Sequence, residues 1–321
     1  MEKNYLPLVS VIMPIHNRFD LVEEAIESIV NQRYRPIELI IIDDCSDEVF
    51  NYESIRKGVS IVIYRLKTNS GPGRAREFGR SKFNGEFLCY MDSDDICHED
   101  KFLLQVETLK ASPNVGMCYS QTSEFLINPL SESILLRLNN VCGYGSFFPV
   151  MFSGRPWSTG SCMWTKEAIQ KIGPWVDSWH WEDYAYDFVA GCLGIKIKFI
   201  PIVLYFKRQD HNIDRLSNRS ANVAEVDIAI SIRFMADTLL RIKDVPQSVI
   251  DQFKNKYLKA NIKKLIRYDD VEIAKEMLII MLQLTEKHYK RIIIKILFNT
   301  LQFIRCNILR GLWKTAFKYL I

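Results

Sequence analysis

Residues 87–98 read FLCYMDSDDICH, an apolar run that stops abruptly on three carboxylates, Asp92, Asp94 and Asp95. Apolar runs of this length are typical of buried strands. Asp92 and Asp94 are two residues apart, so in extended backbone their side chains leave the same side and can share one hard cation. Alternatively, Asp94 or Asp95 caps a helix near 99–111. Like charges crowded at a strand end cost stability, and the neighbouring loops have to decide between a bound cation and a helix cap.

The surrounding sequence predicts an α/β fold. Amphipathic stretches alternate with short runs rich in β-branched residues, which is the rhythm of βαβ units on a mostly parallel central sheet. The run IELIII is apolar on both faces, as expected for a sheet that is flanked by helices on both sides. The predicted strands lie at 9–15, 37–42, 59–66, 86–91 and 116–121. A helical stripe between the first two consists of Val22, Ala25, Ile26, Ile29 and Val30.

Ligands of such sheets bind beyond the carboxyl ends of the strands, so the residues that follow each strand are the candidates for a site. Asp43 and Asp44 end the strand IELIII, where one carboxylate can accept a hydrogen bond from a nucleobase while its neighbour faces the ribose or the solvent. The alternative is a helix cap formed by Ser46 or Asp47. That alternative explains these two residues but leaves the pair at 43 and 44 unexplained.

The stretch NSGPGRARE follows the third predicted strand and supplies positive charge. Its two glycines permit a tight turn, and Pro72 suits the first turn of a helix. Arg74 and Arg76 then lie where backbone N–H groups and the helix dipole favour an anion. We expect this loop, together with a cation on the aspartates at 92 and 94, to hold a diphosphate. A surface turn that is merely basic is the alternative.

Acidic and aromatic residues gather again at 179–187, WHWEDYAYD. Glu182 and Asp183 open a predicted helix, and tryptophans crowd the loop before it. Aromatic faces and carboxylates together are typical of sugar-binding sites. The alternative is a core tryptophan cluster with capping acids, which we favour for Trp175, whereas for Asp183 we favour a role in chemistry. His211 is a weaker candidate, because an isolated histidine is more often structural, although an imidazole near a hard cation can complete its ligand shell.

These loops, in this order, resemble the family 2 glycosyltransferases of the GT-A nucleotide-sugar fold. The resemblance covers about residues 8–217 and implies a GT-A catalytic domain over residues 1–220. From about residue 222 on no strand signal remains and helical periodicity continues to the end, so we expect a C-terminal helical appendage over 221–321. The matching segments are VSVIMPIHNR, IELIIIDDCSD, NSGPGRAREFG, FLCYMDSDD, WSTGSCMWTKEAIQKIGPW, WEDYAYDFVAGCLG and YFKRQDHN.

The resemblance also implies a role for each matching residue. The backbone around Pro14 and His16, together with Asp44, would hold the base, usually uracil. Asp92 and Asp94 match the Asp-x-Asp that meets the ribose and the diphosphate-bound Mn²⁺ or Mg²⁺, and Asp183 matches the catalytic base. Arg76 matches an arginine of the loop after the third strand, and His211 falls near a position that sometimes touches metal or phosphate. We add Asn17 and Asp43 as nucleotide-sugar contacts, and Trp157, Gly160, Trp181 and Glu182 as contacts to the sugar or the acceptor.

The implied activity is inverting, metal-dependent transfer of a hexosyl or N-acetylhexosaminyl group from a nucleotide-sugar, most simply a UDP-sugar. The acceptor would be a saccharide or a lipid-linked saccharide, in surface polysaccharide or glycan biosynthesis. Glu77 replaces the family's usual asparagine, so the local contact of that asparagine is not expected here. No Gln-x-x-Arg-Trp pattern follows Asp183, and this absence argues against a processive synthase. The alternatives are a non-catalytic nucleotide-binding scaffold of the same fold and a metal-dependent phosphohydrolase with Asp92 as nucleophile.

Composition adds expectations about location and partners. The first residues lack the layout of a secretory signal, and apolar runs are too short to cross a bilayer, so we expect a cytoplasmic protein. The net charge of +4 hides a split, because residues 241–321 carry 17 Lys+Arg against 7 Asp+Glu. Residues 287–321 contain eight basic residues and no acid, interleaved with apolar ones. This pattern predicts either a peripheral contact with an anionic membrane surface or a packed helix with a basic outer face, and no nucleic-acid partner.

Overall fold

A computed structural model of the chain describes residues 6–52, 58–125, 145–209, 221–268 and 270–285, with 291, 294 and 295. The chain divides into two compact units. The first comprises Met1–Asp177 and Tyr186–Asp214, and the second comprises Ser178–Ala185 and Arg215–Ile321. Asp183 thus belongs to the second unit, although its helix continues into the first.

The first unit is built on one mixed sheet with the strand order β3-β2-β1-β4-β7-β6-β8-β5. β1, β2, β3 and β4 pair in parallel, whereas β7 and β5 run antiparallel to their neighbours, and β6 and β8 pair in parallel. The strands are β1 (Val9–Ile15), β2 (Ile37–Asp43), β3 (Val59–Arg65), β4 (Phe87–Tyr90), β5 (Ile96–Cys97), β6 (Met117–Phe125), β7 (Cys162–Thr165) and β8 (Ile197–Arg208). The five predicted strands are confirmed with small shifts at their ends.

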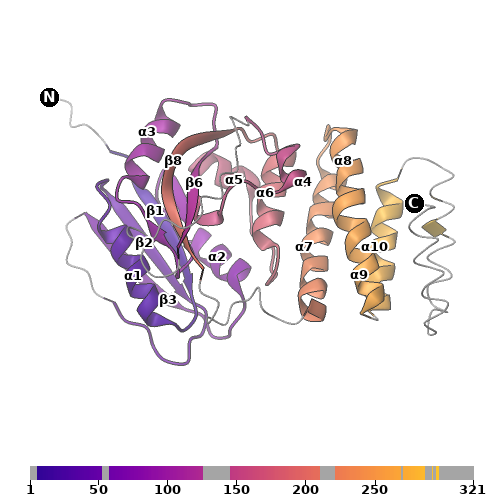
Figure 1. Cartoon of the computed structure of the whole chain (residues 1–321), viewed down its shortest axis with the longest axis horizontal. Helices are drawn as coiled ribbons and strands as arrows, with labels where there is room; N and C mark the ends of the chain where they lie inside the picture. The colour runs from indigo at the N-terminus through magenta and orange to yellow at the C-terminus, as the bar shows by residue number, and fades with distance from the viewer. Residues whose placement is uncertain are drawn as a thin grey trace. The chain divides into compact units, whose positions relative to one another are not determined.

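Helices cover this sheet as its apolar pattern predicts (Figure 1). The helices of the first unit are α1 (Phe19–Val30), α2 (Pro72–Arg80), α3 (Lys101–Lys110), α4 (Val150–Ser153), the 3-10 turn η1 (Thr159–Ser161), α5 (Lys166–Ile172) and most of α6 (Glu182–Cys192). The predicted stripe of α1 is buried in one core cluster with Val11, Leu39 and Phe102. On the other sheet face, α2 approaches so closely that a Cβ on Gly79 would lie 2.5 Å from the side chain of Ile12. Both faces of the central strands are therefore dry, as the continuous run IELIII requires.

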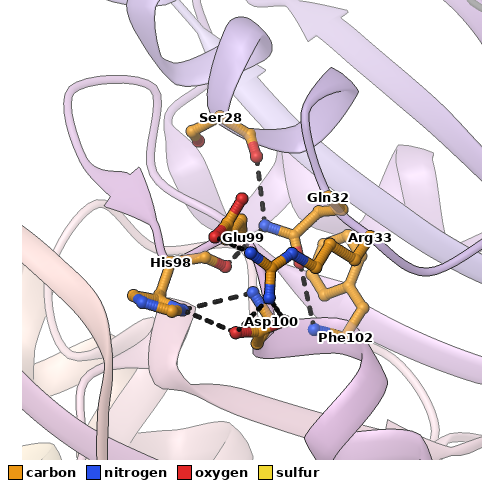
Figure 2. A network of polar contacts seen from close by, with 7 residues as sticks. All are labelled: Ser28, Gln32, Arg33, His98, Glu99, Asp100 and Phe102. Atoms are coloured by element: carbon orange, nitrogen blue, oxygen red, sulfur yellow. Dashed lines mark hydrogen bonds and ion pairs between the residues drawn. The ribbon is translucent and has the colours of Figure 1, made fainter.

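A polar network fixes the end of α1 against the segment that follows β5 (Figure 2). Buried Gln32 donates from Nε2 to the carbonyl oxygens of Ser28 (3.0 Å) and His98 (2.7 Å), and its Oε1 accepts from the N–H of Phe102 (3.1 Å). Arg33 pairs with the carboxylate of Asp100 at 3.1 Å on the exposed side. Since α3 begins at this point, the network sets where the chain turns after the aspartate-rich loop.

The second unit is helical in its described part. Its helices are α7 (Ala221–Arg241), α8 (Gln247–Phe253), the π-helical segment η3 (Lys254–Leu258), α9 (Lys259–Arg267) and α10 (Val271–Gln283), which lie side by side in Figure 1. Their apolar faces bury residues such as Met235, Ile262 and Met277. The segment at 178–185 joins this unit through His180, whose Nδ1 lies 3.0 Å from Asp227 Oδ2, and through Ser178, whose Oγ donates to the Asp227 carbonyl (3.0 Å).

Among the residues that the structure describes, no helix combines the length and the apolar character needed to span a membrane.

Candidate functional site

The loops after β1 and β2 are bonded to each other at the carboxyl edge of the sheet. His16 Nδ1 lies 3.1 Å from the backbone carbonyl oxygen of Asp44, and its Nε2 lies 3.0 Å from the side-chain nitrogen Nδ2 of Asn69. Because a carbonyl can only accept, Nδ1 carries the hydrogen and Nε2 accepts from Asn69. The N–H of Asn17 donates to Ser46 Oγ (2.8 Å). Three strand-end loops are thus joined at His16, next to Pro14, which lies opposite Ile42 in the sheet.

Backbone strain is concentrated in the same two loops. Asn17, Arg18 and Cys45 adopt left-handed conformations with φ of 56°, 55° and 61°. Non-glycine residues rarely occupy this region, and they do so mainly where the surroundings impose it, often at binding sites. Asn17 is held by a reciprocal pair of bonds with Asp47, from Nδ2 to Oδ2 (3.0 Å) and from the Asp47 N–H to Oδ1 (2.9 Å).

The carboxylate of Asp44 lies at the N-terminus of α2. Its two carboxylate oxygens accept from the N–H groups of Ser70 (2.8 Å) and Gly71 (2.7 Å). Burial raises the pKa of Asp44, and these two bonds oppose the rise. The expected turn is confirmed, with Gly71 at φ 86° and Pro72 in the first turn. The N–H groups of Ser70 and Gly71 have Asp44 as their partner. The predicted binding of a diphosphate by this loop, with Arg74 and Arg76, stays a prediction.

Asp43 points to a different set of partners and is 1% exposed. Its Oδ1 accepts from the N–H of Ser46 (2.8 Å), and its Oδ2 lies 3.3 Å from Arg65 Nη1. No helix lies between β2 and β3 in the described residues, so the capping alternative for Ser46 and Asp47 is wrong there. Both residues instead bind the loop after β1.

Arg76 connects α2 to the aspartate-rich loop. Arg76 is 5% exposed, and its guanidinium donates from Nη2 to Asp92 Oδ1 at 2.8 Å. Trp175 covers the guanidinium, with Cζ 5.1 Å from the ring centroid, and Arg74 forms an exposed pair with Asp177 (3.3 Å). A buried cation needs a partner of opposite charge, and Asp92 is that partner for Arg76. The Asp92 side chain is 38% exposed, so its carboxylate can also reach a ligand at the surface.

The other two aspartates of the loop have separate partners. Asp94 Oδ2 lies 3.3 Å from Arg18 Nη1. Asp95 is 2% exposed and accepts from Tyr205 Oη (2.5 Å) and from the N–H of Arg208 (2.9 Å). Burial, followed by the charges of Asp94 and Asp92, raises the pKa of Asp95 well above its usual range. The capping alternative for Asp94 and Asp95 is wrong, because the N-cap residue of α3 is Asp100.

Arg208 is a residue of the loop's surroundings that the sequence did not single out. Its Nε donates to the carbonyl oxygen of Asp94 (3.0 Å), and its Nη2 pairs with Glu24. These contacts and its backbone bond to Asp95 tie the aspartate-rich loop to the end of β8. Arg18 and Tyr205 were likewise not predicted as site residues. Tyr205 and Arg208 lie in the matching segment YFKRQDHN, but that segment indicated no role for them, and it is their place on β8 beside β5 that brings them here.

The donor set at the strand end fits a hard divalent cation. Asp92 and Asp94 supply carboxylate oxygens, the ligands that Mg²⁺ and Mn²⁺ prefer, and Mg²⁺ commonly uses one or two carboxylates together with substrate phosphates. Within the described ranges no group of three His, Cys, Asp or Glu side chains could hold a metal by itself. Two carboxylates therefore need further oxygen ligands from a phosphorylated substrate and water. The predicted third ligand, His211, lies outside the described residues, as does most of the basic segment 287–321.

Trp157 and Gly160 lie inside the first unit. Trp157 is 4% exposed, and its Nε1 donates to Asp187 Oδ2 (2.7 Å). Arg155 pairs with the same oxygen (3.1 Å). Gly160 packs against Tyr205. The predicted contacts of Trp157 and Gly160 with sugar or acceptor stay predictions. Gly160 lies against Tyr205, which bonds to Asp95 of the aspartate-rich loop.

Replacing Gly160 with Ala is expected to destabilise the first unit. The new Cβ would lie 2.2 Å from Tyr205 Oη, which cannot move away without breaking its bond to buried Asp95. Overpacking of this kind costs about 1–3 kcal/mol in the free energy of unfolding, measurable by urea denaturation. Gly145→Ala is the control, because its Cβ would have no neighbour within 4 Å. Equal stability of the two variants would contradict the close packing described for Tyr205.

The remaining predicted residues belong to the second unit. Asp183 lies in the first turn of α6, where its Oδ1 accepts from the N–H of Tyr184 (2.7 Å). Glu182 is buried, and Trp181 adopts φ 62° with its ring 5.3 Å from Tyr184 and 5.4 Å from Tyr257. The catalytic role of Asp183 and the sugar contacts of Trp181 and Glu182 stay predictions.

The mixed sheet, curled and flanked by helices, with its strand-end loops of acids and glycines, defines a GT-A glycosyltransferase architecture. Solved structures share it over nearly the whole chain. The structure of S. aureus TarS in complex with UDP-GlcNAc matches with a TM-score of 0.69 at 14% identity, over 97% of this chain and 90% of that one. The mannosyltransferase PcManGT from Pyrobaculum calidifontis, in complex with GDP-Man and Mn²⁺, matches with a TM-score of 0.54 at 16% identity, over 99% and 86%. The expected fold class is confirmed.

Residues 10–164 match the family Glycosyl transferase family 2. An uncharacterized glycosyltransferase of Rickettsia felis is 32% identical over 164 residues, which are 51% of this chain and 27% of the relative. One of Haemophilus influenzae is 33% identical over 139 residues, 40% of this chain and 55% of the relative. The putative teichuronic acid biosynthesis glycosyltransferase TuaG of Bacillus subtilis is 37% identical over 109 residues, 32% and 42%. The matches thus span about a quarter to just over half of these relatives' lengths, and with the fold they support a family 2 glycosyltransferase.

Proposed function

We propose that this chain transfers a sugar from a nucleotide diphosphate donor, most simply a UDP-sugar, to a saccharide or lipid-linked saccharide acceptor with inversion. The observation that carries the proposal is the joining of four strand-end loops at one sheet edge, through His16, Asp44, Arg76 and Asp92. The structures of TarS hold UDP-GlcNAc and UDP, which supports a UDP-sugar as the donor. Similarity to TuaG, a putative teichuronic acid biosynthesis glycosyltransferase, supports a role in cell-surface polysaccharide synthesis.

The base would bind at the loops after β1 and β2. Asp43 and Asp44 are engaged by protein donors, but each carboxylate oxygen can accept more than one hydrogen bond, so acceptor capacity for a base N–H remains. The backbone at 14–17, held by its bonds to Ser46 and Asp47, would form the adjoining wall. The ribose and diphosphate would then extend toward Asp92 and Asp94.

Asp92 and Asp94 would hold Mn²⁺ or Mg²⁺ together with the diphosphate oxygens. When bound, such an ion offsets the negative charge that grows on the leaving diphosphate. The PcManGT structure, which contains Mn²⁺, supports a divalent ion in this architecture. Arg76 keeps the Asp92 carboxylate oriented by its 2.8 Å bond. Arg18, now paired with Asp94, would supply a second positive charge near the diphosphate.

Asp183 would act as the general base. It would take the proton from an acceptor hydroxyl as that oxygen attacks the anomeric carbon on the face opposite the diphosphate. The bond from oxygen to carbon forms as the bond to the diphosphate breaks, so the anomeric configuration inverts without a sugar-enzyme intermediate. The aromatic rings at 181 and 184 would cover apolar faces of the sugar or acceptor.

For a lipid-linked acceptor, the basic segment 287–321 would keep the protein at an anionic membrane surface by electrostatic attraction. Co-sedimentation with liposomes of anionic lipid, compared between the whole chain and one in which the basic residues of 287–321 are neutralised, tests this part. Equal sedimentation of both proteins would contradict the proposed membrane contact of residues 287–321.

The proposed activity is tested with a panel of nucleotide-sugars in the presence of Mn²⁺ or Mg²⁺. We expect release of free nucleotide from one donor class, and its loss on addition of chelator. Turnover that persists without divalent ions would contradict the proposed role of Asp92 and Asp94. A protein that binds nucleotide but turns over no donor with any saccharide acceptor would favour the non-catalytic scaffold.

A further inference from the structure

Glu77, which stands where the family pattern has asparagine, is engaged by three donors. Its Oε2 accepts from Arg80 Nε at 2.7 Å and from the backbone N–H of Trp175 at 3.0 Å. Its Oε1 accepts from Arg80 Nη2 at 2.7 Å. The carboxylate thus links α2 to the loop between α5 and α6, which is nearly one hundred residues away in the sequence.

That link holds Trp175 in an aromatic cluster. Trp175 is 5% exposed, and its ring stacks on Tyr186 with 4.3 Å between centroids and 11° between planes. It meets the edge of Tyr90 at 4.7 Å. A backbone held by Glu77 and a ring held between two tyrosines leave Trp175 little freedom to move.

Trp175 in turn covers the guanidinium of Arg76. The distance of 5.1 Å between Cζ and the ring centroid is within the range of a cation–π contact, which is stronger in a desolvated place. Arg76 is 5% exposed, and its Nη2 donates to Asp92 at 2.8 Å. Any shift of the tryptophan would admit water to Arg76 and loosen the hold of the arginine on Asp92.

We infer that Glu77 is a positioning residue for the donor site, acting through Trp175 and Arg76 on the carboxylate of Asp92. The inference rests on the proposed function, because it assumes that Asp92 binds the nucleotide-sugar and its cation. Asparagine could not do the same, since its single amide oxygen cannot accept from both Arg80 nitrogens and from Trp175 with charge-assisted bonds. The departure from the family pattern is therefore a second way of fixing the arginine that precedes it.

The test is the replacement Glu77→Gln, which keeps the shape of the side chain and removes its charge. We expect the Kd for UDP in the presence of Mn²⁺, measured by calorimetry, to rise about tenfold, the lower range seen when an outer partner of a metal ligand is lost. In turnover, KM for the donor rises with kcat nearly unchanged. Glu276→Gln is the control, because Glu276 forms an exposed pair with Arg233 on the second unit. It should leave the Kd unchanged.

A double variant separates positioning from general destabilisation. If Glu77 acts through Arg76, the double variant Glu77→Gln/Arg76→Met should have nearly the same Kd for UDP as Arg76→Met alone. If the two residues act independently, the free-energy effects of the two replacements on UDP binding should add. Should Arg76→Met not fold, the comparison of Glu77→Gln with Glu276→Gln decides alone. If the wild type binds UDP and Glu77→Gln binds it equally tightly, the positioning role of Glu77 alone is overturned. A wild type that binds no nucleotide overturns the proposed function and this inference together.

Discussion

Replacing Asp183 with Asn is expected to abolish sugar transfer while leaving nucleotide binding intact. An amide has the shape of the carboxylate but cannot take the proton of an acceptor hydroxyl, and loss of a general base lowers kcat by about 10²–10⁴-fold. The amide oxygen can still accept from the N–H of Tyr184, as Oδ1 does at 2.7 Å, so the first turn of α6 should persist. Steady-state release of nucleotide with acceptor present, and calorimetry with UDP, measure the two effects.

Asp177→Asn is the matched control for this variant. It makes the same chemical change six positions earlier, at a side chain that is 66% exposed and pairs with exposed Arg74. Its kcat should equal that of the wild type. If Asp183→Asn kept full transfer, Asp183 would not be the base, and the neighbouring buried Glu182 would be the next carboxylate to replace.

Replacing Asp94 with Asn should raise the Mn²⁺ concentration needed for half-maximal turnover. A neutral amide oxygen binds a hard cation less strongly than a carboxylate, and loss of even an outer partner of a metal site costs about 10–100-fold in affinity. We therefore expect a shift of about 100-fold, measured by titrating Mn²⁺ into chelator-treated enzyme at saturating donor.

Asp100→Asn provides the control for Asp94, because Asp100 lies in the same segment but pairs with Arg33 in the network of Figure 2. Its Mn²⁺ dependence should match the wild type. An unchanged Mn²⁺ requirement in Asp94→Asn would show that the strand-end aspartates do not bind the cation.

The sequence predicted β1, β2 and β4 well, because each is a nearly continuous buried run that carries its own signal. The two-residue strand β5 and the short β7 were not predicted, since both owe their pairing to partners far along the chain. Local pattern contains no information about which distant strand will lie alongside.

The same limit applies to the site. The acidic loops were found because their charges interrupt apolar runs. The partners of those charges were found only in part, since they depend on the strand order. Tyr205 meets Asp95 across 110 positions because β8 pairs with β5. The loop NSGPGRARE was expected to hold a diphosphate, yet the N–H groups of Ser70 and Gly71 in this loop bond to Asp44, an anion that the chain itself supplies.

Hydrogen exchange of the backbone amides, with and without UDP and Mn²⁺, tests the central claim that the carboxyl edge of this sheet binds the nucleotide. We expect slower exchange in the loops at 14–18, 43–47, 68–76 and 92–95, because a bound nucleotide orders them and excludes water. UDP binding that leaves these four loops unchanged, or that protects only segments elsewhere in the chain, would contradict it.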